Sequence, residues 1–516
     1  MVPRAAPAGR RRPHRVTLSS RQALALAALA GVVHTASFAP LNAYWLQPLA
    51  VAALVLLLRT ATPGQAFVRG WAFGSAWLAS GLWWLYISMH DFGGLPAPLA
   101  AAAVGLLALA LSLYLAAAMA AWARWRSGRP MADAAGLAGL WLLAELARAQ
   151  FLTGFPWIAS GYAHADGLLA ALAPWGGVYA MGALATLLAA LLVLGRGASA
   201  NACRLLAMGL LAGLMALPQH FTEPAGELTV SLLQPAVPQD LKFDPERLGA
   251  NMQALQQQLH AASGALVVTP ESVLPIPRDL LDEGYWAGLT APFRQGDRAA
   301  LIGTFVGNER DGFVNAMVGV QPGASPDYEY GKRHLLPFGE YIPPGFRWFV
   351  DLMRIPLGDQ ASGHHGASFA VAGQRVRPLI CYEDLFGEDF ADAVVGPQAA
   401  TLLVNASNLA WFGRWMVQDQ HLQFSRLRAL EFQRPLVRAT NTGATAVIDH
   451  RGVVTQRLPA WQEGTLDATV QGRRGDTPYA RWLAAWGLWP LWGLAAALLG
   501  AMRMGALLAG RRRVAP

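Results

Sequence analysis

The sequence predicts a polytopic α-helical membrane domain joined to a water-exposed α/β domain. Of the 516 residues, 54% are hydrophobic and only 14% are charged, whereas an average soluble domain carries roughly 25% charged residues. Apolar residues dominate up to about position 217, become sparser over 218–480, and dominate again near the C-terminus. We therefore expect an N-terminal tail over 1–22, a membrane domain over 23–217, a soluble domain over 218–480, and a last membrane helix with a tail over 481–516.

The membrane part contains eight stretches that are apolar enough to be expected as membrane-spanning helices. They cover 23–39, 43–58, 67–89, 95–122, 134–152, 167–194, 203–217 and 482–503. The second and the seventh are short. No clear signal-peptidase site follows the first stretch, so we expect it to remain as a span.

Loops that contain basic residues alternate along the chain with loops that contain none. They occur in both tails and in the loops 59–69, 123–133 and 195–204, but not in the loops 39–42, 90–95 and 153–166. Basic loops stay on the cytoplasmic side of a membrane. Both tails are thus expected in the cytoplasm, and the soluble domain on the opposite, periplasmic face of a bacterial inner membrane. The net charge of +8 then reflects orientation signals and not nucleic-acid binding.

Two ionisable residues, Glu145 and Arg148, lie one helical turn apart in the fifth stretch. Ionisable side chains inside a membrane are costly and usually have a partner or a function. The pair is interpreted either as a contact for lipid headgroups or as an internal ion pair.

The soluble domain alternates short β-type runs with helical stretches. The runs are 228–233, 265–269, 299–306, 314–320, 376–380, 401–404, 436–439 and 445–454, and the clearest helical stretches are 245–262 and 418–432. Strands mixed with helices predict a layered α/β domain, and about 240 residues are enough for a core of its own.

Cys381 follows the apolar run Val376–Ile380, where a strand is expected to end. A thiol at a strand end, in a domain that also offers carboxylates and a lysine, is a candidate nucleophile. The alternative is a buried structural cysteine, because a free cysteine behaves as a small hydrophobic residue. The other cysteine, Cys203, lies beside an expected span and is the one possible disulfide partner within the chain.

Other polar residues also follow the ends of expected strands. Glu271 follows the run 265–269, Lys332 follows Tyr330-Gly331, and Glu340 lies in the same loop as Lys332. If these ends meet in one crevice, a carboxylate takes the thiol proton, while the ammonium group lowers the thiol pKa and stabilises an oxyanion. Each residue taken singly is more often a surface or ion-paired residue.

Ordered motifs along the chain resemble the apolipoprotein N-acyltransferases, a membrane-embedded family of the nitrilase superfamily. The motifs of the soluble domain are Thr269-Pro270-Glu271-Ser272, Tyr330-Gly331-Lys332-Arg333-His334, Pro337-Phe338-Gly339-Glu340-Tyr341, Ile380-Cys381-Tyr382-Glu383, Asn405-Ala406-Ser407-Asn408 and Arg428-Ala429-Leu430-Glu431. In the membrane part, Trp83-Trp84-Leu85-Tyr86 and Gly154-Phe155-Pro156-Trp157 are also similar. The order of the motifs is specific, whereas one motif alone would indicate only a nitrilase-type amidase.

The resemblance implies a nitrilase-like αββα sandwich for the external domain, with a Glu-Lys-Cys triad. In that triad, Glu271 would be the general base, Lys332 the oxyanion stabiliser and Cys381 the nucleophile. Glu340 would support the triad and help to position the substrate. The resemblance implies no cofactor. No metal site is expected, because His364 and His365 lack suitably spaced acidic or cysteine partners.

Further residues match positions of the family motifs, and for two of them a structural role is the alternative. Tyr382 and Glu383 match the residues that follow the nucleophile. The alternative for Tyr382 is packing against the next strand, and for Glu383 an ion pair that orients Lys332 or a loop. Phe243 stands where the family often has Trp, which puts a gating role of that ring in doubt, and Leu409 replaces an Asp of the family motif.

The implied reaction is a ping-pong acyl transfer. Cys381 attacks the sn-1 ester of a phospholipid and keeps the acyl chain as a thioester. The chain then passes to the α-amine of the diacylglyceryl-cysteine at the N-terminus of an apolipoprotein. The implied partners are the phospholipid donor, the apolipoprotein acceptor and membrane lipids, and the enzyme is expected to be a monomer.

Two aromatic segments of the soluble domain are candidates for a lipid doorway. The segment 342–357 contains Phe346 and Trp348, and the second segment begins at Trp411. Exposed apolar surface is unusual without a partner, so we hypothesise that these side chains lie at the outer leaflet and admit the lipid. The alternative is ordinary core packing.

Two other functions stay open. A membrane-anchored nitrilase-type amidase would use the same triad with water as the second nucleophile, although eight spans argue against it. A transporter with an external ligand-binding domain is less favoured, because the spans carry few ionisable residues and show no duplicated halves.

Overall fold

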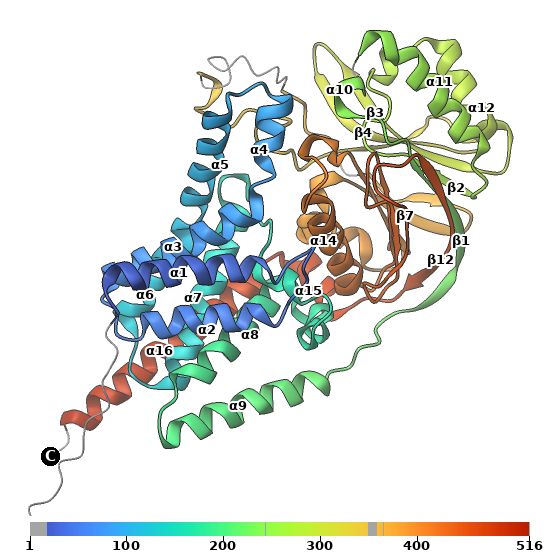
Figure 1. Ribbon diagram of the computed structural model, residues 1–516. Helices are drawn as coiled ribbons and strands as arrows, with labels where there is room; N and C mark the ends of the chain where they lie inside the picture. The colour runs from blue at the N-terminus through green and yellow to red at the C-terminus, as the bar shows by residue number, and fades with distance from the viewer. Residues whose placement is uncertain (1–17, 243, 349–358, 365, 515–516) are drawn as a thin grey trace, which may run out of the picture.

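The computed structural model describes residues 18–242, 244–348, 359–364 and 366–514. A bundle of apolar helices lies on one side and a layered α/β domain on the other (Figure 1). The α/β domain occupies the chain between the seventh apolar helix and two C-terminal helices. Both of its ends therefore return to the bundle.

Helices lie at all eight places where the sequence predicts apolar helices. They are α1 (Ser20–Thr35), α2 (Leu46–Leu58), α3 (Pro63–Leu82), α5 (Ala97–Leu111) with α6 (Leu113–Trp125), α7 (Pro130–Gln150), α8 (Ala173–Leu194), α9 (Ala198–Met215) and α16 (Trp489–Val514); the short α4 (Leu85–Ile87) follows α3. The last helix begins at Trp489 and not near 482. A separate helix, α15 (Pro478–Trp486), ends at Gly487, whose φ of 54° favours glycine.

Four helical segments of the described chain are long and apolar enough to cross a membrane. They are Ala97–Trp125, Leu168–Leu194, Ala198–Met215 and Trp489–Leu507. Other bundle helices are shorter, such as α2 with 13 residues, or carry more charges, such as α7 with Asp133, Glu145 and Arg148. Length and composition thus support four spans directly.

The α/β domain is built on two six-stranded sheets, with the orders β12-β1-β2-β3-β4-β5 and β11-β10-β9-β8-β7-β6. The strands of the first sheet are β1 (Glu223–Gln234), β2 (Leu266–Val268), β3 (Ala299–Asn308), β4 (Gly312–Val320), β5 (Tyr328–Gly331) and β12 (Gly464–Arg474). Those of the second are β6 (Phe369–Val371), β7 (Gln374–Ile380), β8 (Leu402–Ser407), β9 (Leu436–Thr440), β10 (Ala446–Ile448) and β11 (Val454–Arg457). In each sheet three parallel strands, β1-β2-β3 or β7-β8-β9, carry antiparallel neighbours on both sides.

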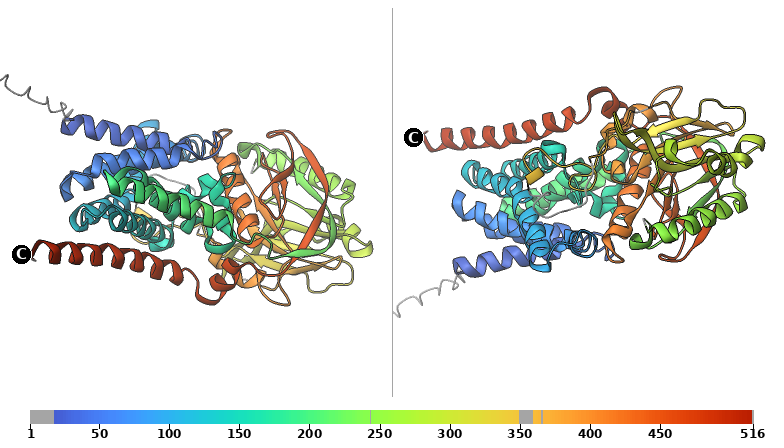
Figure 2. Two further views of the ribbon diagram at one scale, coloured as in Figure 1. Left: turned by 90° about the horizontal axis from the view of Figure 1, so that it is seen from below. Right: turned by 90° about the horizontal axis from the view of Figure 1, so that it is seen from above.

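The two sheets pack face to face and are covered by helices on both outer faces. Apolar side chains such as Val268 of the first sheet and Ile380 of the second form the core between them. The helices α11 (Pro245–Ala261) and α12 (Glu283–Gln295) cover the first sheet. The helix α14 (Val417–Phe432) covers the second sheet and also packs against the bundle (Figure 2). The result is an αββα sandwich whose α14 layer joins it to the membrane domain.

Several elements at the edges of the sheets were not predicted from the sequence. The missed elements are α12, β5, β6 and β12, and the run 445–454 forms β10, a turn and the start of β11 instead of one strand. Gly452, with a φ of 74°, lies in that turn. Strand propensity depends on cross-strand packing, and an edge strand has only one neighbouring strand, so its local pattern is weak.

Glu145 and Arg148 are both buried, and among the described residues they form no direct ion pair with each other. Glu145 Oε1 accepts a hydrogen bond from the backbone N–H of Ser160 at 2.7 Å. Arg148 Nη1 donates to the carbonyl oxygens of Phe155 and Trp157, each at 2.9 Å. The expected ion pair is therefore absent, and the two side chains instead fix the loop that follows α7.

Candidate active site

The three residues of the candidate triad follow the ends of three strands. Glu271 follows β2, Lys332 follows β5, and Cys381 follows β7. Two of these strands belong to the first sheet and one to the second, so face-to-face packing of the sheets brings the three side chains together. Electrostatic interactions join Cys381 to both Glu271 and Lys332.

Glu271 is buried with both carboxylate oxygens bound. Its Oε1 accepts hydrogen bonds from Asn315 Nδ2 at 2.8 Å and from Lys332 Nζ at 3.3 Å. Its Oε2 accepts from the backbone N–H of Asn408 at 2.9 Å. Burial alone would raise the pKa of Glu271, but Lys332 and these hydrogen bonds outweigh it and hold the pKa below its usual value. The resting residue is therefore an ionised carboxylate, ready to accept a proton.

Lys332 is 1% exposed and lies between two carboxylates. Its Nζ is 2.7 Å from Glu340 Oε1 and 3.3 Å from Glu271 Oε1. Burial alone would lower the pKa of Lys332, but the two carboxylates raise it above its usual value. Glu340 is itself held by the backbone N–H of Leu336, which donates to its Oε2 at 2.8 Å. The site thus keeps a fixed positive charge beside the thiol.

Cys381 is half-buried, and its backbone has a φ of 50°, in the left-handed region. Both Cys381 and Cys203 are free thiols, so the one disulfide that the chain could form is absent. Burial and the charge of Glu271 raise the pKa of the Cys381 thiol well above its usual value, although Lys332 opposes this. The net effect is opposite to the lowered pKa expected from the sequence. The resting thiol is neutral and must lose its proton as it attacks.

Asn315 is a site residue that the sequence analysis missed. It lies on β4, and its Nδ2 donates to Oε1 of Glu271 at 2.8 Å and to Oε1 of Glu340 at 3.1 Å. Its carbonyl oxygen accepts from the backbone N–H of Lys332 at 2.7 Å. The one available signal was a single amide side chain within the apolar run Val314–Val320.

Comparison with known proteins assigns the family. The model of the apolipoprotein N-acyltransferase N-terminal domain matches residues 30–191, and the model of carbon-nitrogen hydrolases matches residues 212–479. A protein of Verminephrobacter eiseniae named apolipoprotein N-acyltransferase is 47% identical, over 90% of this chain and 92% of its own length. The chain belongs to the apolipoprotein N-acyltransferase family. Proteins of the same name from Ralstonia nicotianae and Bordetella bronchiseptica are 44% and 41% identical, over 89% and 95% of this chain and 90% and 97% of their own lengths.

Tyr382 and Glu383, the two residues after the thiol, bind different parts of the surrounding chain. Tyr382 Oη donates to the carbonyl oxygen of Gly154, in a loop of the membrane domain, at 3.2 Å. Glu383 Oε1 accepts from the backbone N–H of Arg333 and Oε2 from Tyr330 Oη, both at 2.8 Å. Glu383 therefore orients the loop that carries the lysine, by hydrogen bonds and not by the ion pair considered from the sequence.

The loop after α7 contacts the lysine loop directly. His334 Nε2 lies 3.0 Å from the carbonyl oxygen of Thr153, and Tyr341 Oη is 2.9 Å from Thr153 Oγ1. The membrane domain thus helps to shape the loop of the soluble domain that carries Lys332. The sequence analysis noted the Gly154-Phe155-Pro156-Trp157 motif but not this contact.

The aromatic residues assigned to the lipid doorway lie at the surface. Phe346 is 46% exposed, Trp348 65% and Trp411 37%. Core packing is therefore the wrong interpretation for Phe346 and Trp348. The ring of Trp411 lies 5.7 Å from that of Phe92, which ends the short π-helix Ser88–Phe92 of the bundle. Residues 349–357 of the first aromatic segment lie outside the described residues.

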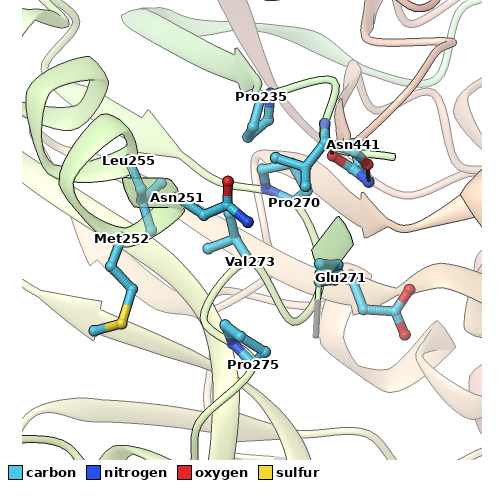
Figure 3. Close-up of a pocket in the computed structure, with 11 residues that line it drawn as sticks. Pro235, Asn251, Met252, Leu255, Pro270, Glu271, Val273, Pro275 and Asn441 are labelled. Carbon is cyan, nitrogen blue, oxygen red and sulfur yellow. Dashed lines mark hydrogen bonds between the residues drawn. The ribbon is translucent and has the colours of Figure 1, made fainter. Parts of the chain in front are cut away.

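A small cavity opens beside Glu271 (Figure 3). Met252 and Leu255 of α11 line one wall, and the carboxylate of Glu271 is directed away from them (Figure 3). Lys242 also lines the cavity, and burial lowers its pKa to about 8. Phe243, the next residue, lies outside the described residues. The base side of the site thus borders a small cavity lined by α11 and Lys242.

Proposed function

We propose that this chain transfers a fatty acyl chain from a membrane phospholipid to the N-terminal amine of a diacylglyceryl-cysteine on apolipoproteins. The observation that carries the proposal is the cluster of the buried Glu271 and Lys332 with the half-buried Cys381, at the junction with an apolar helical bundle. The acyl acceptor is inferred from the family, because the relatives are named apolipoprotein N-acyltransferases.

In the first half-reaction, the neutral thiol of Cys381 attacks the sn-1 ester carbonyl of the phospholipid. Glu271 takes the thiol proton as the C–S bond forms, and the ammonium of Lys332 stabilises the oxyanion. The ester C–O bond then breaks. Glu271 returns the proton to the leaving lysophospholipid oxygen, and the acyl chain remains as a thioester.

In the second half-reaction, the neutral α-amine of the acceptor attacks the thioester carbonyl. The C–N bond forms, the C–S bond breaks, and Glu271 takes the surplus proton from the amine. The proton then returns to the sulfur of Cys381, which restores the free thiol. Water must be kept out during this interval, because it would hydrolyse the thioester.

The membrane arrangement that fits this chemistry has eight spans, with both tails in the cytoplasm and the catalytic domain over 218–480 in the periplasm. Helices at all eight expected places and the alternation of basic loops support it. The catalytic domain then sits above the outer leaflet of the inner membrane, where one monomer has access to lipid and lipoprotein alike.

The lipid is proposed to reach Cys381 past Phe346, Trp348 and Trp411. Their exposure supports this path, because large apolar side chains in contact with water are stabilised by burial in lipid. The contact of Trp411 with Phe92 places the second aromatic segment next to the bundle.

Intact mass spectrometry of the reconstituted protein, incubated with phospholipid, tests the function. The expected result is one acyl adduct that hydroxylamine removes, that Cys203→Ser retains and that Cys381→Ser abolishes. A diacylglyceryl-cysteine peptide added afterwards should discharge the adduct and become N-acylated. Release of free fatty acid in the presence of the peptide, without N-acyl product, would instead indicate the amidase. Absence of any adduct would refute the thioester mechanism.

A further inference from the structure

The backbone of Cys381 adopts a conformation that needs support from its surroundings. A left-handed φ is unfavourable for a non-glycine residue and persists only where neighbouring groups hold it. The carbonyl oxygen of Cys381 has two such neighbours. Asn405 Nδ2 of β8 lies at 3.0 Å, and His421 Nε2 of α14 at 3.1 Å.

The tautomer of His421 follows from its other ring nitrogen. Arg438 Nη2 lies 2.9 Å from His421 Nδ1. A guanidinium group only donates, so Nδ1 must accept, and the proton of the neutral ring must be on Nε2. Burial and Arg438 also keep the pKa of His421 below its usual value, against the opposing charge of Asp384. The Nε2–H group is thus always a donor, and it points at Cys381.

The partners of His421 form a closed buried cluster under the nucleophile. Asp384 Oδ1 lies 2.9 Å from His421 Nε2, and so shares that proton with the carbonyl oxygen of Cys381. Asp384 Oδ2 accepts a short hydrogen bond from Ser425 Oγ and lies 3.4 Å from Arg438 Nη1. His421, Asp384, Ser425 and Arg438 all have no exposed surface. Each member is fixed by at least one other, so the ring of His421 has one position.

We infer that His421 is a positioning residue that holds the left-handed turn at Cys381 and so aims the sulfur at the substrate carbonyl. His421 lies on α14, the helix that joins the sandwich to the bundle, and its hydrogen bond connects this helix to Cys381. His421 does not touch the substrate and takes no proton in either half-reaction. The inference rests on the proposed nucleophilic role of Cys381.

The test uses the full-length protein with Cys203→Ser, so that Cys381 is the only thiol. His421→Leu removes the donor, whereas His421→Gln offers an amide N–H toward Cys381 and an oxygen toward Arg438. Two rates are measured: alkylation of Cys381 by iodoacetamide, and acylation by phospholipid in vesicles. We expect His421→Leu to lower both by about 10- to 100-fold through misplacement of the sulfur, with an unchanged KM for phospholipid. His421→Gln should recover most of each rate.

The outcomes separate a positioning role from a merely structural one. Lower yield of folded His421→Leu with an unchanged rate per folded molecule would overturn the inference, as would equal rates for all variants. If His421→Leu does not fold, His421→Asn serves instead, because its shorter side chain leaves the donor away from Cys381. Fast alkylation and acylation of Cys381 in His421→Gln, with slow reactions in His421→Asn, support the inference. Equal rates in the two variants refute it. If the parent forms no thioester, the proposed function fails, yet the alkylation rates still decide whether His421 positions the thiol.

Discussion

Replacement of Asn315 by Leu should shift the pH dependence of acyl-enzyme formation to higher pH. The variant keeps the side-chain volume but removes the donor 2.8 Å from Glu271 Oε1. A hydrogen bond to a charged group contributes about 1.5–3 kcal/mol, and one pKa unit corresponds to about 1.4 kcal/mol. Because that bond favours the ionised form, its loss should raise the pKa of Glu271.

The sign of the effect follows from the direction of the shift in the parent. The pKa of Glu271 is held below its usual value. The ionised carboxylate therefore stabilises the folded protein at every pH above the pKa that Glu271 has in the unfolded chain. That contribution is lost as the pH falls through the lower, folded-state pKa. In Asn315→Leu the base protonates at a higher pH. The acidic limb of the acylation profile should move to higher pH, and the rate at a pH on that limb should fall by about 10- to 100-fold.

The assay is the initial rate of adduct formation on Cys381, followed by intact mass spectrometry from pH 4 to 9. Thr304→Val is a matched control, since Thr304 is a buried polar residue of the neighbouring strand β3 whose Oγ1 donates to the carbonyl oxygen of Ile276 at 3.2 Å. The control should leave the profile in place. An Asn315→Leu profile that coincides with the parent, or moves to lower pH, would refute the assignment of Asn315 as the group that keeps Glu271 ionised.

Two further predictions concern the lysine and the doorway. Glu340→Gln removes the closer carboxylate of Lys332, 2.7 Å away, and should slow adduct formation by roughly 10- to 100-fold through misplacement of the ammonium; an unchanged rate contradicts the supporting role. Phe346→Ser combined with Trp348→Ser should slow acylation by phospholipid in vesicles but not alkylation of Cys381 by iodoacetamide. Leu280→Ser, at a similarly exposed apolar residue, is the control, and equal slowing by both surface changes would count against a lipid path there.

Much of the fold was predictable because it depends on local pattern. Most elements lie near their predicted places: the apolar stretches, α11, α14 and most central strands. A buried strand or an apolar helix can be predicted because its pattern of apolar residues lies within one short segment of the sequence. The ends of these strands also marked Glu271 and Cys381, whereas Lys332 follows β5, which was not predicted. The elements missed, such as β5 and β12, are edge strands whose position is set by their pairing.

The electrostatic state of the site was not predictable in the same way. From the sequence, Lys332 was expected to lower the thiol pKa, but the buried environment and Glu271 raise it. The sequence shows which charges are present and not how deeply each is buried. Depth of burial decides the cost of ionisation, so only the packed structure gives the direction of the shift.

The sequence by itself determined the division into membrane and soluble parts, the strand ends that carry Glu271 and Cys381 of the candidate triad, and the family. Only the tertiary structure decided how the triad is held. Asn315 meets Glu271 across 44 residues of chain, His421 meets Cys381 across 40, and Tyr382 meets Gly154 across 228. The periodicity of apolar residues along one helix or strand does not indicate such long-range contacts. They arise when the two sheets, α14 and the bundle pack together, and that packing fixes the atoms around the thiol.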